Sequence, residues 1–299
     1  MNNPLHSRAS RKAGFTLLEL LVVIGIIGIL MAVSISQFGG ATESAKATTC
    51  MTNLRNLATA CQNVAMANDW GHFPAAQSYK FTDFAGGHTV YYTHRGWIGS
   101  SDVHADNRQK AGGTQFPFIT GNERDRLLAL TNGAIWKAIG GSTKCYQCPV
   151  HAASCSKRRK RNPTWSYVMN QDFGYDKNNG SGPLAHQIAR SLENIKGGDR
   201  LLLFSEIQGV DVAEHGLKAK TDGSGSDADS VLQYDKNEVI GFNHQITGKR
   251  WVAHCAFADG HVGRLMYPKS GMSLTELTKA LCQGHERNFD GSRYEDMSK

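Results

Sequence analysis

Three residues close to the N-terminus combine types and a spacing that could do chemistry. A basic leader ends at Gly14, an apolar run begins at Phe15, and one carboxylate, Glu19, lies inside that run. A run of about 20 apolar residues is long enough to cross a bilayer as a helix, where an ionisable group is costly and usually functional. If the chain is cut after Gly14, Phe15 gains a new α-amino group. Glu19, one helical turn away, then becomes a candidate partner for an amine.

Two simpler interpretations of this segment compete. A secretory signal peptide has an apolar core of about 7–15 residues, followed by small residues at the cleavage site. Here the core is longer, and a charge interrupts it near its start. A plain membrane anchor would not need Glu19, because a leucine would be less costly there. The segment therefore favours a third kind of signal, in which the carboxylate has a purpose.

A second group of reactive side chains lies within eleven residues and consists of Cys145, Cys148, His151 and Cys155. Three thiols and an imidazole at this spacing could bind zinc. Disulfide bonds are the alternative in an exported domain, and the sequence favours them. The chain has seven cysteines, so at least one thiol is free or pairs between chains. The sequence does not give the connectivity; the disulfide candidates are Cys145, Cys148, Cys155, Cys255 and Cys282.

Oxygen-rich side chains in the glycine-rich segment 221–230 could bind calcium, which prefers such ligands. The segment lacks the regular aspartate ladder and distal glutamate of a helix–loop–helix calcium site. The sequence therefore predicts no cofactor, with calcium as the alternative. The candidate metal ligands are Asp222, Ser224, Asp227 and Asp229.

Three histidines near the C-terminus, His244, His254 and His261, could form an acid–base or metal cluster with Asp259. Asp259-Gly260 is typical of a two-residue hairpin turn. In such a hairpin His254 would lie roughly 13 Å further along the ladder than His261, too far for both to act on one substrate atom. His244 has no predicted position. The sequence therefore predicts a protein that is not an enzyme.

The longest predicted element is a helix from Phe15 to about Asn68, roughly 80 Å long at 1.5 Å per residue. Its first half is apolar on all sides, whereas in its second half apolar residues recur at spacings of three and four. Such a helix would meet lipid or other helices with its first half and pack on its own domain with its second. The apolar face of the second half consists of Met51, Leu54, Leu57, Ala58, Cys61, Val64 and Ala65.

The rest of the chain predicts an α+β fold: a long N-terminal helix, membrane-spanning in its first half, packed on an antiparallel β-sheet with irregular insertions. Predicted strands cover 164–169, 200–207, 249–258 and 261–267; predicted helices cover 122–130, 183–196 and 273–282. The domain division is leader 1–14, transmembrane or filament-core helix 15–37, amphipathic helix 38–70 and globular domain 71–299.

Composition and charge indicate the cellular location of the chain. The chain has 299 residues, 40% of them hydrophobic, which is enough for a substantial core. The net charge is +7, and three of those charges belong to the leader, so the balance is a weak argument for an acidic partner. The basic run 157–161 lacks interleaved aromatic residues, so no nucleic-acid partner is predicted. Basic residues flanking a span stay cytoplasmic, which predicts a single-pass inner-membrane protein with its N-terminus in the cytoplasm and its globular domain in the periplasm.

The segment Gly14 to Ile24 reads Gly-Phe-Thr-Leu-Leu-Glu-Leu-Leu-Val-Val-Ile and closely resembles the signal of type IV pilins and type II secretion pseudopilins. The resemblance implies that a prepilin peptidase cuts between Gly14 and Phe15 and methylates the Phe15 amine. It implies that Glu19 acts in assembly. The chain would then be a structural subunit of a pseudopilus or pilus-like filament, with its globular domain in the periplasm or on an extracellular filament. Its partners would be other pilin-like subunits, the inner membrane and an assembly platform.

Short motifs in the globular part resemble a large group of pilin-like proteins of Planctomycetes, Verrucomicrobia and Lentisphaerae. They are Cys50–Leu57, Cys148-Pro149, Trp165–Asn170, Leu201–Glu206 and Ala256–Val262. The group's signature has nine residues between a histidine and Asp-Gly, whereas here fourteen residues separate His244 from Asp259. Membership implies pilus-like assembly without an agreed activity for the globular domain. The alternative function is a minor tip pilin that binds a glycan or other polymer through the aromatic residues of 70–163.

Overall fold

The structure is a computed structural model that describes residues 15–68, 71–76, 79–85, 88–94, 96–99, 123–159, 163–173, 195, 197–219, 230–234, 238–246, 250–268 and 273–284. In the ranges 32–39, 79–94 and 123–126, and at residue 159, the description covers the backbone only. The chain divides into two compact units, Met1–Ser44 and Ala45–Lys299.

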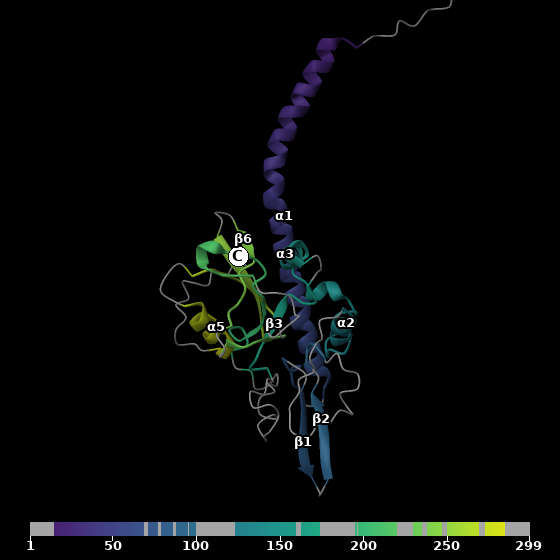
Figure 1. The fold of residues 1–299 in the computed structure, drawn as a ribbon, viewed down its shortest axis with the longest axis vertical. Helices are drawn as coiled ribbons and strands as arrows, with labels where there is room; N and C mark the ends of the chain where they lie inside the picture. The colour runs from purple at the N-terminus through teal and green to yellow at the C-terminus, as the bar shows by residue number, and fades with distance from the viewer. Residues whose placement is uncertain are drawn as a thin grey trace, which may run out of the picture. The chain divides into compact units, whose positions relative to one another are not determined.

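The longest element is α1, a helix that runs without interruption from Leu17 to Ala67 (Figure 1). This confirms the predicted long helix. The segment contains no proline, so no backbone N–H is missing from its hydrogen-bond ladder. Asn68 ends the helix: its Nδ2 donates to the Val64 carbonyl at 2.9 Å, and its Oδ1 accepts from the His72 N–H at 3.0 Å. None of the helices, as far as the structure describes them, has the length and hydropathy that a membrane span requires.

The C-terminal part of α1 buries the face that the sequence predicts. These side chains share one hydrophobic core with residues of the sheet, among them Phe204 and Phe257. Met51 and Val64 are half-buried at the margin of this face. The fully buried members are Leu54, Leu57, Ala58, Cys61 and Ala65.

A six-stranded sheet packs with α1 in the same core. Its strands are β3 (Tyr167–Asn170), β4 (Leu202–Glu206), β5 (Val231–Leu232), β6 (His244–Ile246), β7 (Arg250–Phe257) and β8 (Val262–Met266). The strand order is β5-β3-β4-β7-β6, and β8 pairs with β7. All pairs are antiparallel except β3 with β5, which is parallel. The prediction of an antiparallel sheet is therefore corrected, since the sheet is mixed. Strand β5 was not predicted, because a two-residue strand shows no periodic pattern.

A separate antiparallel pair of strands, β1 (Tyr79–Ala85) and β2 (His88–His94), lies where the sequence predicts irregular structure. The signal for this hairpin was present. Two runs rich in aromatic and β-branched residues flank the dipeptide Gly86-Gly87, and such a dipeptide is typical of a tight hairpin.

Three further helices complete the described fold: α2 (Glu123–Thr131), α3 (Pro149–Arg159) and α5 (Leu274–Gln283), with short 3-10 turns η1 (Thr143–Tyr146) and η3 (Ala213–His215). Helices α2 and α5 confirm two predicted helices, and α5 opens with the expected capping box. Ser273 Oγ accepts from the Glu276 N–H at 3.1 Å, and the Glu276 carboxylate accepts from the Ser273 N–H at 3.2 Å. Helix α3 was not predicted. Most of the predicted helix 183–196 lies outside the described residues.

The turn between β7 and β8 has three residues, Ala258 to Gly260, between the hydrogen-bonded Phe257 and His261, one more than the predicted two-residue turn. The Phe257 N–H donates to the His261 carbonyl at 3.0 Å, and the Gly260 N–H donates to the Phe257 carbonyl at 2.9 Å. Gly260 has φ +93°, which side-chain-bearing residues rarely adopt. Helix α1 contacts this loop, because Gln62 Nε2 donates to the Ala258 carbonyl at 3.1 Å.

Candidate functional site

The first turn of α1 holds Thr16 and Glu19 in a reciprocal arrangement. The Thr16 backbone N–H and hydroxyl both donate to Glu19 Oε2 at 2.8 Å, and the Glu19 N–H donates to Thr16 Oγ1 at 3.2 Å. This is a capping box, which the sequence interpretation missed although Thr16 and Glu19 have the required spacing. Both donors use Oε2. Within the described chain Oε1 accepts no hydrogen bond, so it can receive one from another group.

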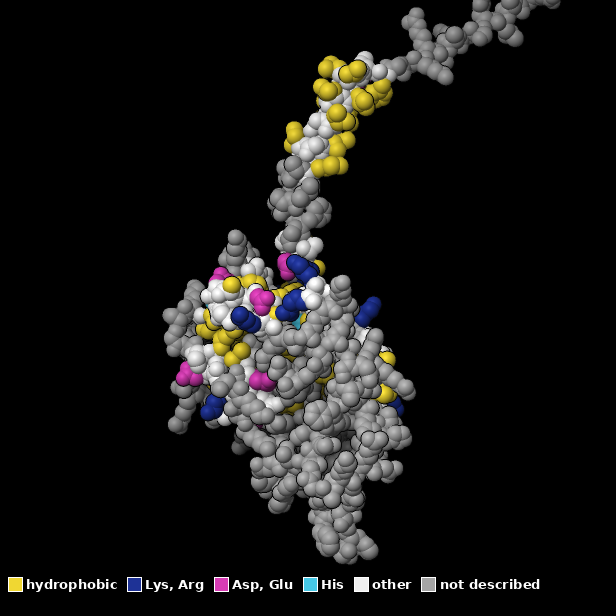
Figure 2. Space-filling view, viewed as in Figure 1, with side chains coloured by type: hydrophobic (Ala, Val, Ile, Leu, Met, Phe, Trp, Pro, Cys, Tyr) yellow, Lys and Arg dark blue, Asp and Glu magenta, His cyan; other side chains and the backbone are white. Residues whose placement is uncertain are grey.

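In the unit Met1–Ser44, the described part of α1 leaves its apolar side chains exposed (Figure 2). Phe15 is 81% exposed and Leu21 is 58% exposed. A contiguous apolar surface of this kind is uncommon on a soluble monomer and marks an interaction site. The exposed large apolar side chains are Phe15, Leu17, Leu18, Leu20, Leu21, Val22, Val23, Ile24, Ile26, Ile27, Ile29, Leu30 and Met31.

Several predicted site residues lie outside the described part of the chain. Gly14 precedes the first described residue. The four candidate calcium ligands, Asp222, Ser224, Asp227 and Asp229, also lie outside it. The calcium interpretation therefore stays a prediction.

All seven cysteines are free thiols in the structure, so none of the expected disulfide bonds is formed in it. Cys145 is half-buried, whereas Cys148, Cys155, Cys255 and Cys282 are buried. Burial raises the pKa of the Cys255 thiol well above its ordinary value, which makes this thiol less reactive. The disulfide connectivity of the chain stays a prediction.

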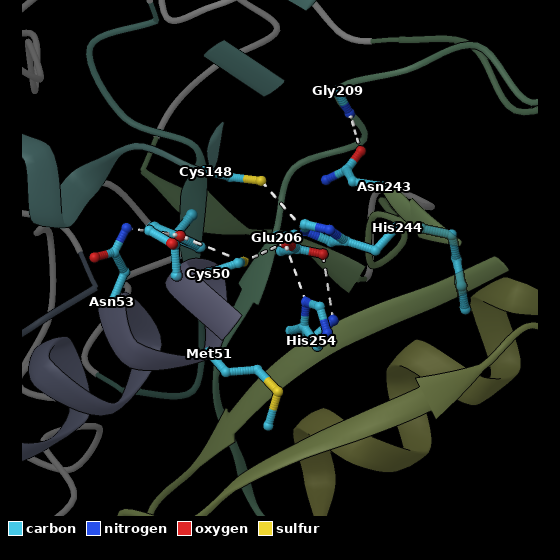
Figure 3. Close-up of polar contacts among 12 residues, drawn as sticks. Cys50, Met51, Asn53, Cys148, Glu206, Gly209, Asn243, His244 and His254 are labelled. Carbon is cyan, nitrogen blue, oxygen red and sulfur yellow. Dashed lines mark hydrogen bonds and ion pairs between the residues drawn. The ribbon is translucent and has the colours of Figure 1, made fainter. Parts of the chain in front are cut away.

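Within the unit Ala45–Lys299, four buried side chains from distant parts of the sequence meet (Figure 3). His244 Nε2 lies 2.9 Å from Glu206 Oε1 and 3.5 Å from Cys148 Sγ. Cys50 Sγ donates to Glu206 Oε1 at 2.5 Å. One potential ligand atom from each residue lies within 4.8 Å of the others. We call this set, Cys50, Cys148, Glu206 and His244, the buried cluster.

Each member of the buried cluster is held by a different element. Cys50 lies on α1, and Cys148 directly precedes Pro149, the first residue of α3. Glu206 is the last residue of β4, and His244 is the first residue of β6. Both of these strands pair with β7, which brings the carboxylate and the imidazole together.

The electrostatics of the buried cluster depend on the Glu206–His244 pair, of which the side chains are 0% and 1% exposed. Burial disfavours both charged forms, but the two opposite charges stabilise each other. The net result lowers the pKa of Glu206 far below its ordinary value and raises the pKa of His244 to about 10. Without a metal, the two side chains therefore form a buried ion pair near neutral pH.

The two thiols of the buried cluster are shifted in opposite directions. Burial, together with Cys148 and the Glu206 charge, raises the pKa of Cys50 well above its ordinary value. Burial also opposes ionisation of Cys148, but hydrogen bonding from Cys50 and His244 outweighs it and lowers the pKa of Cys148. Cys148 is therefore the thiol that ionises first.

His254 and Tyr167 surround the cluster. The His254 backbone N–H donates to Glu206 Oε2 at 3.2 Å, and its ring lies 4.5 Å from the His244 ring, centre to centre. The Tyr167 hydroxyl donates to Cys50 Sγ at 3.4 Å. These groups orient the carboxylate and one sulfur from outside the set of four.

The zinc interpretation built on 145–155 is wrong in its ligand set. Among the described residues, the buried cluster is the one group of three or more potential metal ligands, and it takes only Cys148 from that segment. His151 is completely buried on α3, and neither of its ring nitrogens has a hydrogen-bond partner in the described structure. Cys145 lies on η1, Cys148 lies between η1 and α3, and only His151 and Cys155 lie on α3, so different elements hold the four side chains.

The prediction that His254 and His261 lie apart is confirmed, whereas the grouping of all three histidines with Asp259 is corrected. His261 stacks on Phe257 at 4.3 Å and its Nδ1 lies 2.7 Å from Asp259 Oδ1, on the surface and outside the buried cluster. His244 and His254, by contrast, lie together at Glu206. The sequence interpretation missed Glu206 and Cys50. One signal for Glu206 was present in the sequence, because it ends the apolar strand Leu202–Glu206. Acidic residues are rarely buried unless they are paired, so an acid on a buried strand indicates a partner nearby.

Comparison with known proteins gives one match. Residues 9–35 match the family described as the prokaryotic N-terminal methylation motif. No curated protein and no solved structure matches the chain. The matched segment contains Phe15 and Glu19, so the N-terminal part of this chain carries a type IV pilin-like signal, which is typical of proteins that a prepilin peptidase processes.

Proposed function

We propose that this chain is a structural subunit of a type II secretion pseudopilus or a type IV pilus-like filament, and that it is not an enzyme. The leader 1–14 lies in the cytoplasm, the first half of α1 crosses the inner membrane, and the globular domain lies in the periplasm. A prepilin peptidase cuts between Gly14 and Phe15 and methylates Phe15. Sequence motifs of the globular part support membership of the pilin-like group of Planctomycetes, Verrucomicrobia and Lentisphaerae.

One observation carries this proposal: the methylation motif coincides with the exposed apolar surface of α1. Thirteen large apolar side chains between Phe15 and Met31 are exposed in the isolated chain. Their exposure is costly in water and favourable in lipid or among neighbouring helices. A Cβ at Gly25 or Gly28 would meet no atom within 4 Å, so both glycines offer flat positions for close helix approach.

Glu19 serves assembly through its second oxygen. Oε2 accepts hydrogen bonds from Thr16 of the same chain, and Oε1 accepts one from the Phe15 amine of a neighbouring subunit. Either charge alone is expensive in hydrocarbon, so pairing them favours one axial register between subunits. The second half of α1 stays packed on the globular domain.

The alternative, a minor tip pilin that binds a glycan, gains no support from the described aromatic residues. Trp97 is completely buried, stacks on Tyr146 and donates from Nε1 to the Ser230 carbonyl at 3.1 Å. Trp136 is half-buried and also stacks on Tyr146. Side chains engaged in this way are core, not a sugar platform.

Processing tests the proposal. Gly14→Val places a branched side chain at the cleavage position, so we expect unprocessed precursor to accumulate in the membrane fraction while the wild-type chain is cut. Immunoblots of membranes from cells with and without the prepilin peptidase give the reference mobilities. Cleavage of Gly14→Val at the wild-type rate would contradict the proposal.

A further inference from the structure

The buried cluster combines four donor atoms that metal ions prefer over water: two thiol sulfurs, an imidazole nitrogen and a carboxylate oxygen. The atoms come from positions 50, 148, 206 and 244, so no local turn geometry explains their convergence. All four side chains are 0–1% exposed. A folded core rarely collects so many polar atoms at one point unless each is satisfied there.

Hydrogen bonding among the four groups alone satisfies them poorly. Glu206 Oε1 is contacted both by His244 Nε2 and by Cys50 Sγ, while the same His244 nitrogen also faces Cys148 Sγ. His244 Nδ1 has no partner in the described structure. When a metal replaces the proton that Nε2 shares with Glu206, the proton on Nδ1 stays, and the Nε2 lone pair faces the same point as the two sulfurs and the carboxylate oxygen. The four ligand atoms then face one metal position.

We propose that the buried cluster binds one zinc ion, with ligands Cys50 Sγ, Cys148 Sγ, Glu206 Oε1 and His244 Nε2. Two thiolates select a borderline-soft ion over calcium or magnesium, and four mixed sulfur, nitrogen and oxygen ligands suit the tetrahedral preference of zinc. Binding releases three protons, one from each thiol and one from the His244 imidazolium. The ion with two thiolates, one carboxylate and a neutral imidazole carries a net charge of −1.

Groups around the cluster disperse that negative charge. The Tyr167 hydroxyl donates to Cys50 Sγ at 3.4 Å, and the His254 N–H donates to the free carboxylate oxygen, Glu206 Oε2, at 3.2 Å. Hydrogen bonds of this kind orient ligands and tune their affinity for a metal. They also fix which carboxylate oxygen faces the ion.

The zinc is structural. Four protein ligands close its coordination sphere, and their complete burial leaves no position for water or substrate. The ion joins α1 to the segment before α3 and to two strands of the sheet. It therefore clamps the amphipathic half of the helix onto the domain at Cys50, close to the point where the unit Ala45–Lys299 begins.

A disulfide between Cys50 and Cys148 is the competing use of the same sulfurs. It would convert both thiols into one S–S bond, and the contacts of Glu206 and His244 with the two sulfurs would then have no role. Each sulfur instead contacts a third ligand atom, Glu206 Oε1 or His244 Nε2, which a disulfide does not need.

Metal analysis of the full chain, purified in detergent without added chelator, tests the zinc site. We expect one zinc ion per chain, measured by inductively coupled plasma mass spectrometry. Cys50→Ser and Cys148→Ser should bind zinc at least about 10-fold more weakly in chelator competition. Cys61→Ser and Cys255→Ser are matched controls, because these thiols are equally buried but outside the cluster, and they should retain wild-type zinc.

Cobalt titration of the metal-free wild-type chain keeps the test decisive if the serine variants do not fold. Tetrahedral thiolate ligation predicts visible d–d bands and a near-ultraviolet sulfur-to-cobalt charge-transfer band that zinc abolishes. The zinc proposal is overturned if the folded wild-type chain takes up neither metal, if non-reducing peptide mapping finds a Cys50–Cys148 disulfide, or if Cys50→Ser keeps wild-type zinc affinity.

Discussion

The two units of the chain use α1 in opposite ways. In Met1–Ser44 the helix exposes leucine, isoleucine and valine side chains and carries its one acidic group in the apolar run, Glu19, at the surface. In Ala45–Lys299 the same helix buries Leu54, Leu57 and Cys61 completely and brings Cys50 to an internal carboxylate. The exposed apolar surface of the first unit is available to other molecules, whereas the buried face in the second unit stabilises the globular fold.

The difference shows where each kind of information lies in a sequence. The N-terminal signal is linear, because cleavage, capping and helix contacts all act within a few turns. The buried cluster is formed only by the topology, which joins residues that are up to 194 positions apart, from Cys50 to His244. We therefore expect a single local change to disrupt the N-terminal signal without unfolding the buried cluster, and the reverse.

The largest expected effect on stability comes from Glu206→Ala. Removing the carboxylate leaves His244 buried without its partner at 2.9 Å. Breaking a buried pair in this way costs about 3–5 kcal/mol of unfolding free energy. Denaturant unfolding of the metal-free full chain in detergent measures this loss, and cleavage after Gly14 should be unaffected.

Asp199→Ala is the matched control for this change. Its carboxylate is 61% exposed and lies 3.6 Å from Arg200 Nε, so its removal should alter the unfolding free energy by less than about 1 kcal/mol. A Glu206→Ala chain as stable as the Asp199→Ala chain would contradict the interior ion pair.

The elements that could be predicted from the sequence are those that depend on local patterns. The length of α1, its buried face, strands β4, β7 and β8 and the capping box of α5 follow from periodicity and local turn chemistry. Helix α3 escaped prediction because the segment around its start, which contains Cys145, Cys148 and Pro149, resembles a disulfide loop or a metal-binding turn. Strand β5 escaped because Val231 and Leu232 are too few to show an alternation.

The candidate sites divide in the same manner. Phe15 and Glu19 could be assigned to the methylation motif from the sequence, because that motif depends on spacing along one short segment. Cys148 was recognised as a potential ligand, but its partners were assigned to its own segment. Glu206 was not recognised, since the sequence does not reveal that β4 and β6 are both neighbours of β7.

Two leucines on α1 sharpen the comparison between the units. Leu57 is 0% exposed and Leu21 is 58% exposed. Leu57→Ala should lower the unfolding free energy by about 2–5 kcal/mol, because it leaves a cavity in the core. Leu21→Ala should leave unfolding nearly unchanged and reduce incorporation into sheared filaments. Equal effects of both substitutions on stability would contradict the division of labour.

A third prediction concerns pH. Burial, with a smaller contribution from the Arg158 charge and against the attraction of Glu206, lowers the pKa of His151 to about 4 from 6.5. As pH falls from 6.5 to 4, the unfolded chain gains a proton that the folded chain refuses, so stability falls. The full loss is about 3 kcal/mol.

His151→Leu removes that titration. The difference in unfolding free energy between variant and wild type should therefore shift in favour of the variant by about 3 kcal/mol between pH 7.5 and pH 4. Taking the difference cancels the titration of groups that both chains share. A difference that is independent of pH would show that the pKa of His151 is the same in the folded and unfolded chains, which contradicts the prediction.

The smallest expected effect separates the two roles of Glu19. Glu19→Gln retains an acceptor for Thr16, whereas Glu19→Ala loses both hydrogen bonds from Thr16. Both lack the charge that would neutralise the Phe15 amine, so both should be processed but poorly incorporated into filaments. Normal incorporation of Glu19→Gln alone would assign Glu19 to capping only.

The most direct measurement of the central claim is the N-terminal mass of the chain in two fractions, membranes and sheared filaments. The account predicts that peptides from the filament fraction begin at Phe15 and carry one N-methyl group, and that the membrane fraction contains both the leader-bearing and the cleaved form. A filament fraction whose chains retain residues 1–14, or a cut at any other position, would contradict it.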